Sequence, residues 1–245
     1  MACLDNNKGF TLIELVAVII IVGILAAIAA QKIGSVAENI KAEETMLEME
    51  ILAHAIVGNE LLYDNGVRSD FGYVGDIGAF PPNLDALTSN PGYGTWNGPY
   101  IKNSFEQLSS DFKQDSWQVD YILSGTQITS SGSGNNIVKY ICGSVDGILY
   151  NNVEGNIFDL DGTPPGDSLN AFISIRLTFP NGAGGYSTLS KTPDKGGYFQ
   201  FDSIPIGNHT LEIIYSPSGD MLRHLVSVTP GSNLYEQNFL TANEW

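Results

Sequence analysis

The feature that most constrains this chain is an uninterrupted apolar run close to its N-terminus. Residues Leu15 to Ala30 read LVAVIIIVGILAAIAA, and the only polar residues between Phe10 and Ala30 are Thr11 and Glu14. A helix of about 20 apolar residues crosses the hydrocarbon core of a bilayer, which is about 30 Å thick. The run therefore predicts a membrane-spanning segment and excludes a plain soluble protein.

Two ordinary functions compete for such a segment, a cleaved secretory signal and a membrane anchor. A secretory signal ends in small residues at its cleavage site, which Ala26 to Ala30 could supply. The residues before the run favour the anchor. They place Glu14 inside the apolar segment, where a carboxylate is costly and usually has a function.

The stretch Lys8-Gly9-Phe10-Thr11-Leu12-Ile13-Glu14 with the following apolar helix resembles the type IV prepilin signature of type IV pilins and type II secretion pseudopilins. The resemblance implies that a prepilin peptidase removes a leader, residues 1–9, by cutting between Gly9 and Phe10. Phe10 would become the N-methylated first residue. Lys8, Gly9 and Phe10 are thus the expected processing residues, and the apolar helix remains as anchor and filament core.

The resemblance also gives Glu14 a role in assembly, as the partner of the Phe10 amine of a neighbouring subunit. The amine lies at the positive end of a helix dipole, where a cation is unfavourable. Charges removed from water in a packed bundle of helices need partners. In the alternative interpretation, Glu14 only reaches the nearby membrane surface.

Apolar residues continue at helical spacing after Ala30, and acidic residues occupy the other positions. The first helix-ending signals are Gly58 and Asp64-Asn65-Gly66. The sequence therefore predicts one helix over residues 10–62, with a transmembrane first part and an amphipathic extension. The apolar stripe of the extension comprises Ile33, Val36, Ala37, Ile40, Leu47, Ile51, Ala55 and Ile56.

Residues 63–150 are expected to form a small α/β pilin globular part. A Trp96-Asn97-Gly98-Pro99-Tyr100 turn and an Asp115-Ser116-Trp117 turn resemble those of the major pseudopilin of type II secretion. In either interpretation the aromatic residues anchor a core. The candidate turn residues are Trp96, Gly98, Pro99, Tyr100, Asp115 and Trp117.

Major pseudopilins commonly bind calcium in a loop near the end of their small sheet. The corresponding residues here, 130–136, contain no carboxylate, and the nearest are Asp111, Asp115 and Asp120. Calcium usually takes several carboxylate and carbonyl oxygens. No metal site is therefore predicted in this region.

Residues 153–240 are predicted to form an all-β sandwich of seven short strands separated by Gly, Pro, Asn and Asp turns. The segments Val153 to Pro164, Asp194 to Phe201 and Ile204 to Ile213 resemble a carboxypeptidase-regulatory-like, or transthyretin-like, domain. Asp159-x-Asp161-Gly162 is interpreted as a tight hairpin turn rather than half of a calcium loop. The expected strands are 153–158, 172–179, 186–191, 198–201, 209–215, 221–229 and 234–240.

Composition excludes several other functions. The formal net charge of −16 argues against nucleic acid as a partner, because phosphates require a basic surface. The three histidines lack metal-ligand spacing, and no nucleophile or phosphate-binding motif occurs. Cys142 is expected to be a small core residue. Neither a cofactor nor an enzymatic activity is predicted.

These observations predict an α+β protein: a long N-terminal pilin-type helix with a small globular part, then the seven-stranded sandwich. The expected protein is a filament subunit of a type II secretion pseudopilus or type IV pilus. Its expected partners are the prepilin peptidase, other subunits and the bacterial inner membrane, which it crosses once with most of the chain on the periplasmic side. An adhesin-like minor pilin and a helix-anchored enzyme are the rivals. A chain ending at Gly147 is predicted to fold and assemble without the sandwich.

Overall fold

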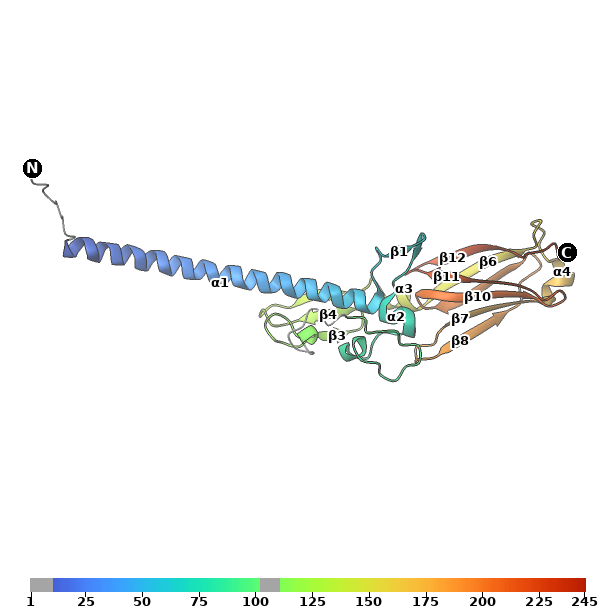
Figure 1. Ribbon diagram of the computed structural model, residues 1–245, viewed down its shortest axis with the longest axis horizontal. Coiled ribbons are helices and arrows are strands. Elements are labelled where there is room, and N and C mark those ends of the chain that lie inside the picture. Colours follow the sequence, from blue (N-terminus) through green and yellow to red (C-terminus); the bar gives the residue numbers. More distant parts are fainter. Residues whose placement is uncertain (1–10, 102–110) are drawn as a thin grey trace, which may run out of the picture.

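The computed structural model describes residues 11–101 and 111–245. Its largest element is the helix α1 (Leu12–Val57), which projects far beyond the remainder of the molecule (Figure 1). All residues from Leu12 to Ile40 whose side chains are described are exposed. Only from Thr45 onward does α1 bury side chains against the globular part. Half of the helix therefore has no partner in the isolated chain.

The end of α1 differs from the sequence expectation, because the helix stops at Val57 rather than Leu62. Gly58 has a φ of 78°, which glycine adopts without strain, and its N–H donates to the His54 carbonyl at 2.7 Å. The guanidinium Nη2 of Arg68 then donates to the Val57 carbonyl at 2.7 Å. These contacts complete the helix end and turn the chain into a short hairpin.

A small globular part packs on the second half of α1. It contains an antiparallel sheet in the order β3-β4-β5, and both β4 and β5 contact α1. Met49, Leu52 and Ile56 of the helix share a buried cluster with Ile128 and Ile141. The elements are β1 (Tyr63–Asp64), β2 (Val67–Arg68), α2 (Gly72–Ile77), η1 (Leu84–Leu87), η3 (Asp111–Lys113), β3 (Ile122–Ser124), β4 (Gln127–Ser130), β5 (Ile137–Tyr140) and α3 (Val145–Leu149).

The C-terminal part is a sandwich of two sheets. One sheet has the order β11-β10-β7-β8 and the other β12-β6-β9, with β12 parallel to β6. Their inward-facing residues alternate along the strands and form one buried cluster. The elements are β6 (Asn151–Phe158), α4 (Gly166–Leu169), η4 (Asn170–Phe172), β7 (Ile173–Pro180), β8 (Tyr186–Lys191), β9 (Tyr198–Ile204), β10 (Gly207–Tyr215), β11 (Asp220–Val228) and β12 (Asn233–Phe239).

The α+β class is thus confirmed. Each strand expected between residues 153 and 240 coincides with one of β6 to β12, although most ends differ by one to three residues. The agreement arises because glycine and proline turns occur at short intervals in this part of the chain, while most of the strands alternate between more buried and more exposed residues.

The sandwich contacts the small globular part directly, and not only through the connection at residues 150–152. Ile206, between β9 and β10, is fully buried in the cluster that contains the α1 residues. Across the junction, the N–H of Gly182 donates to the Ile77 carbonyl at 2.7 Å, and that of Gly231 donates to Gly147 at 2.8 Å. In Figure 1 the sandwich prolongs the molecule on the side opposite to the free end of α1.

Candidate functional site

The expected processing residues Lys8, Gly9 and Phe10 lie outside the described residues. The description begins at Thr11, the N-cap of α1, where Thr11 and Glu14 form a capping box. The Thr11 backbone N–H donates to Glu14 Oε2 at 2.9 Å, and the Glu14 N–H donates to Thr11 Oγ1 at 3.4 Å. In the isolated chain Glu14 therefore helps to cap the N-terminus of its own helix.

This capping function of Glu14 was not predicted, although its signal is present in the sequence. A Thr-x-x-Glu pattern directly before an apolar run is a recognised helix start. The box gives Glu14 a second role besides the expected charge pair. Any test of that charge pair must therefore separate the negative charge of Glu14 from its hydrogen bonds to Thr11.

Among the described residues, α1 is the one helix that is long and apolar enough to cross a membrane. Its apolar side chains are exposed around the whole circumference, with Ile19 62% exposed and Leu25 60% exposed. Such a surface is stable when lipid or other apolar helices cover it. The first half of α1 is therefore suited to burial in a membrane, in a bundle of apolar helices, or first in one and then in the other.

The predicted turn residues around Trp96 come together beside α2 and η1. Trp96 Nε1 donates to the Ala86 carbonyl at 2.8 Å, and its ring meets the Tyr100 ring edge-on at 5.7 Å. The Tyr100 hydroxyl donates to Asp76 Oδ2 at 2.8 Å. A Cβ on Gly98 would overlap the Trp96 ring, so glycine is required there. These residues therefore form a packed structural turn.

Asp115 organises a second turn at a distance in sequence from the first. Its Oδ1 accepts hydrogen bonds from the N–H groups of Trp117 and Val119, both at 3.0 Å. Its Oδ2 accepts from Ser130 Oγ at 2.5 Å and from the Gly132 N–H at 3.0 Å. Burial opposes the charge, but these hydrogen bonds outweigh it and hold the pKa of Asp115 below its ordinary value.

Asp115 thus holds the loop in which the pseudopilin resemblance places calcium. Both carboxylate oxygens are used by protein donors, since each already accepts two hydrogen bonds. Among the described residues, no group of three or more His, Cys, Asp or Glu side chains could hold a metal ion.

Trp117 lies against the exposed face of α1. Its Nε1 donates to Glu38 Oε2 at 2.8 Å, and the Lys41 ammonium lies 5.9 Å from its ring centroid. Nearby, the Tyr121 hydroxyl donates to Glu48 Oε2 at 2.7 Å. Glu38 and Glu48 of the amphipathic extension therefore bind the segment that leads into β3.

The Asp159-x-Asp161-Gly162 segment forms a turn in which the carboxylates bind the backbone. The Thr163 N–H donates to Asp159 Oδ1 at 2.9 Å and to Asp161 Oδ1 at 3.1 Å. The chain then enters α4 instead of returning as a hairpin partner of β6, whose neighbours are β9 and β12. The turn is confirmed, and its assignment to a hairpin is wrong.

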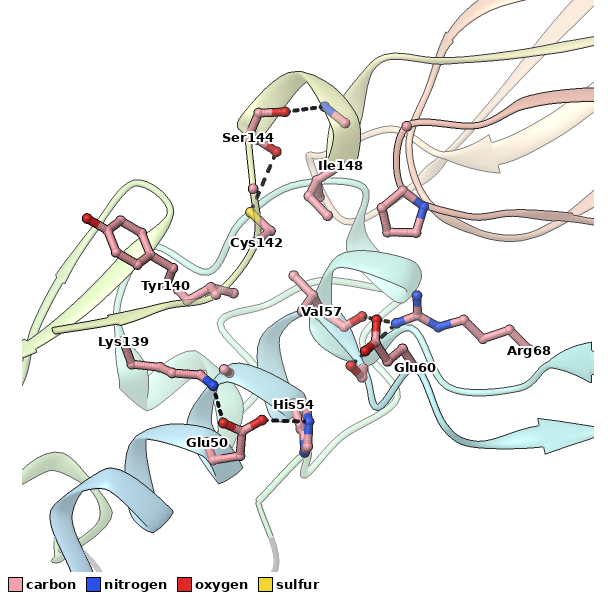
Figure 2. A pocket seen from close by; sticks show the side chains of 17 residues that line it. Glu50, His54, Val57, Glu60, Arg68, Lys139, Tyr140, Cys142, Ser144 and Ile148 are labelled. Atoms are coloured by element: carbon pink, nitrogen blue, oxygen red, sulfur yellow. Dashed lines mark hydrogen bonds and ion pairs between the residues drawn. The ribbon is translucent and has the colours of Figure 1, made fainter. Parts of the chain in front are cut away.

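A cavity of about 440 Å³ lies where the end of α1, β5, α3 and the loop at Gly231 meet (Figure 2). Its charged side chains are largely occupied with one another. Glu50 binds both Lys139 and His54, and the Arg68 guanidinium is occupied by the backbone carbonyls at the end of α1. Among the described lining residues, the Glu60 carboxylate and the Tyr140 hydroxyl make no hydrogen bond, and the other charged groups are occupied.

Cys142 lines the same cavity but lacks the surroundings of a catalytic thiol. Burial raises the pKa of Cys142, although a hydrogen bond with the Ser144 carbonyl lowers it. The Sγ atom lies 3.6 Å from this carbonyl oxygen, and the nearby His54 imidazole binds Glu50 at 3.2 Å. A raised pKa keeps the thiol protonated, and the protonated form is the poorer nucleophile.

The three histidines occupy unrelated environments. His54 lies on α1, His209 is buried in β10 with Nε2 2.7 Å from the Pro205 carbonyl oxygen, and His224 on β11 binds Glu236 on β12 at 2.8 Å. Burial lowers the pKa of His209, although its bond to Pro205 raises it. The structure does not bring these imidazoles together.

Comparison with known protein families matches residues 4–30 to a family described as the prokaryotic N-terminal methylation motif. Comparison with curated proteins finds no match. The matched residues include the expected cleavage junction, Glu14 and the apolar run. Together with the exposed helix α1, the motif supports a pilin-type filament subunit that is processed by a prepilin peptidase and anchored by a single membrane span.

Proposed function

We propose that this chain is a structural subunit of a type II secretion pseudopilus or of a type IV pilus-like filament. The observation that carries the proposal is the continuity between the methylation motif at residues 4–30 and the helix α1, whose described side chains are all exposed from Leu12 to Ile40. A membrane covers the apolar part of this helix, which ends at Ala30, before assembly, and the helices of other subunits cover it afterwards.

The proposed assembly begins with cleavage between Gly9 and Phe10 and N-methylation of Phe10. Phe10 precedes Glu14 by four residues, and this spacing corresponds to about one turn of a helix, whose N-terminal end is the positive end of its dipole. In the filament, Glu14 of one subunit neutralises the amine of its neighbour as both leave the lipid headgroup region. Because both charges then lie away from water, the pairing selects the correct axial position of the incoming subunit.

The position of the sandwich favours a minor subunit over a major one. It extends the molecule beyond the globular part, on the side away from the free end of α1 (Figure 1). In a filament of parallel helices, each internal copy would need space for its sandwich among the neighbours along the axis. A subunit at the end of the filament needs this space only once. A surface-binding minor pilin, with the sandwich as its binding module, is the second candidate.

Intact-mass analysis of the chain from bacterial membranes tests the proposal. We expect a mature protein that starts at N-methyl-Phe10, and we expect Gly9→Leu to block the cleavage. A chain that still begins at Met1, or one cut near Ala30, contradicts the proposal. Neighbouring genes then distinguish a pseudopilus subunit from a pilus subunit. A secretin gene nearby favours the pseudopilus, and a retraction ATPase gene favours the pilus.

A further inference from the structure

A polar groove lies at the junction of the small globular part and the sandwich. It consists of two adjoining cavities of about 270 Å³ and 330 Å³, which share Gly75, Asp76 and Asn208 as lining residues. One wall is α2, and the other is the outer face of the sheet that contains β7, β10 and β11. We call this feature the junction groove.

The junction groove is lined by polar groups that have free hydrogen-bonding capacity. Asp76 uses Oδ2 to accept from Tyr100, and Oδ1 accepts no hydrogen bond from the described part of the chain. Within the same residues, the side chains of Asn97 and Thr210 and the hydroxyl of Tyr186 make no hydrogen bond. The groove thereby differs from the cavity of Figure 2, where charged groups bind one another.

The walls of the groove are fixed before any ligand arrives. The Tyr100 hydroxyl orients Asp76 at 2.8 Å, and the Gly182 N–H ties the sandwich to the end of α2. The Asn208 amide donates to the Arg68 carbonyl at 3.3 Å, which leaves its own carbonyl oxygen available. Groups that are already held in place lose little entropy when a ligand binds.

The chemistry of the groove suits hydroxyl groups better than ions. Asp76 lies on one wall, and the other wall carries Arg223, whose Nε lies 3.5 Å from Glu212 Oε1. Because Glu212 balances the charge of Arg223, an anion finds no strong cationic site in the groove, while a cation would meet the guanidinium opposite Asp76. A hydroxyl can donate to the carboxylate and accept from the guanidinium. Burial raises the pKa of Asp76, although the Tyr100 hydrogen bond lowers it, and further donors from a ligand would stabilise its charged form.

An aromatic surface completes the site. Tyr186 lines the groove at the start of β8, and 67% of its surface is exposed. The face of an aromatic ring can pack against the apolar C–H face of a pyranose while nearby polar groups bind its hydroxyls. We propose that the junction groove is a binding site for a neutral saccharide, held by Asp76, Asn208 and Arg223 and covered by Tyr186.

This proposal deepens the second candidate function, in which the chain binds surfaces, and names the class of ligand. It does not depend on polymerisation, because both walls of the groove belong to a single chain. Binding is therefore measured on the unassembled full-length protein. Loss of filament incorporation would leave the saccharide result untouched, and loss of saccharide binding would leave the filament proposal untouched.

The test uses the full chain in a detergent that has no sugar headgroup. The probes are neutral oligosaccharides of glucose, galactose, mannose and N-acetylglucosamine on an array, followed by calorimetric titration of those that bind. We expect at least one to bind with a dissociation constant of about 1 mM or tighter. No binding across the panel overturns the proposal.

Single-residue variants test whether a saccharide that binds does so in the junction groove. Asp76→Asn and Tyr186→Ser are each expected to weaken binding at least about tenfold while leaving the thermal unfolding temperature unchanged to within a few degrees. The matched controls are Asp202→Asn and Tyr235→Ser, exposed residues on the other sheet, which should bind as the original chain does. Binding that is insensitive to both groove variants, or equally sensitive to the controls, places the sugar elsewhere and overturns the proposal.

Discussion

The N–H of Ile206 donates to the carbonyl of Ile148 at 2.9 Å, and this bond joins the sandwich to the last helix of the small globular part. Both side chains are buried in the cluster that also contains Met49 and Ile56 of α1. The pilin-like part of the chain therefore completes its core with a residue supplied by the sandwich.

Replacing Ile206 with alanine should destabilise both the small globular part and the sandwich. A large-to-small change in a filled core costs about 2–5 kcal/mol, and here the cavity would open between the two parts. Tryptophan fluorescence can follow the transition, since Trp96 and Trp117 report on the globular part and Trp245 on the sandwich. We expect one shared transition at a lower temperature. Ile122→Ala, at an exposed residue, is the control.

The same contacts change the expectation for a truncated chain. A chain that ends at Gly147 loses both Ile148 and Ile206 from the core of the small globular part. We now expect it to be poorly folded, in contrast to what the sequence alone predicts. If that truncated chain unfolds as cooperatively as the full chain, the shared core is not needed.

The stability of the globular part should depend on the charge of Asp115. Its pKa is lowered in the folded state, so its contribution is fully present above the unfolded pKa of about 3.9 and is lost as the pH falls through the folded pKa. Asp115→Asn should cost about 2–3 kcal/mol at neutral pH, because a carboxylate that accepts four hydrogen bonds is removed.

The measurement is denaturant unfolding between about pH 2 and pH 7. The original chain should lose stability below about pH 4, and the Asp115→Asn chain should lose less over the same range. Asp120→Asn serves as the control, because Asp120 is exposed. Parallel pH curves for the original and the Asp115→Asn chain would show that this carboxylate does not determine the acid sensitivity.

Local sequence signals predicted most of the secondary structure. The features that they did not predict depend on tertiary contacts. The strands of the sandwich follow from alternating residues between glycine and proline turns. Ile206 could not be recognised in this way, because it lies in a Pro-Ile-Gly-Asn sequence that locally reads as a turn. Its burial depends on a partner surface that is far away along the chain at Ile56.

At the end of α1 and in the candidate site, too, local sequence signals predicted some features, and tertiary contacts determined the rest. The Asp64-Asn65-Gly66 turn signal is real, but the helix ends earlier, at Gly58, whose positive φ turns the chain out of the helix. Only glycine fits there, because a Cβ would also overlap the Asp70 carbonyl. The turn around Trp96 and the carboxylate of Asp115 were identified by residue type. Their hydrogen-bond partners came from other elements, and no local pattern marks Asp76 as the partner of Tyr100.

Gly98→Ala should disturb the Trp96 turn. The added methyl group overlaps the Trp96 ring, and overpacking of this kind typically costs about 1–3 kcal/mol. Gly143→Ala is the matched control, because a Cβ there has no atom within 4 Å. Thermal unfolding should separate the two variants clearly. Equal unfolding temperatures would mean that the turn repacks without cost.

The last prediction separates the two roles of Glu14. Glu14→Gln removes the negative charge but retains an amide oxygen that can complete the capping box with Thr11. Thr11→Ala keeps the charge and removes the cap, at a cost of about 1 kcal/mol in helix stability. If charge pairing with the Phe10 amine drives assembly, Glu14→Gln should reach the membrane normally yet enter filaments poorly.

Thr11→Ala should then assemble nearly as well as the original chain, because the carboxylate is still present for the neighbouring amine. Sheared-filament fractions and total membranes, quantified by immunoblot, give the ratio of assembled to inserted protein for each variant. A normal ratio for Glu14→Gln with a low ratio for Thr11→Ala would assign the role of Glu14 to helix capping. A normal ratio for both variants would rule out the charge pair and the cap as requirements for assembly.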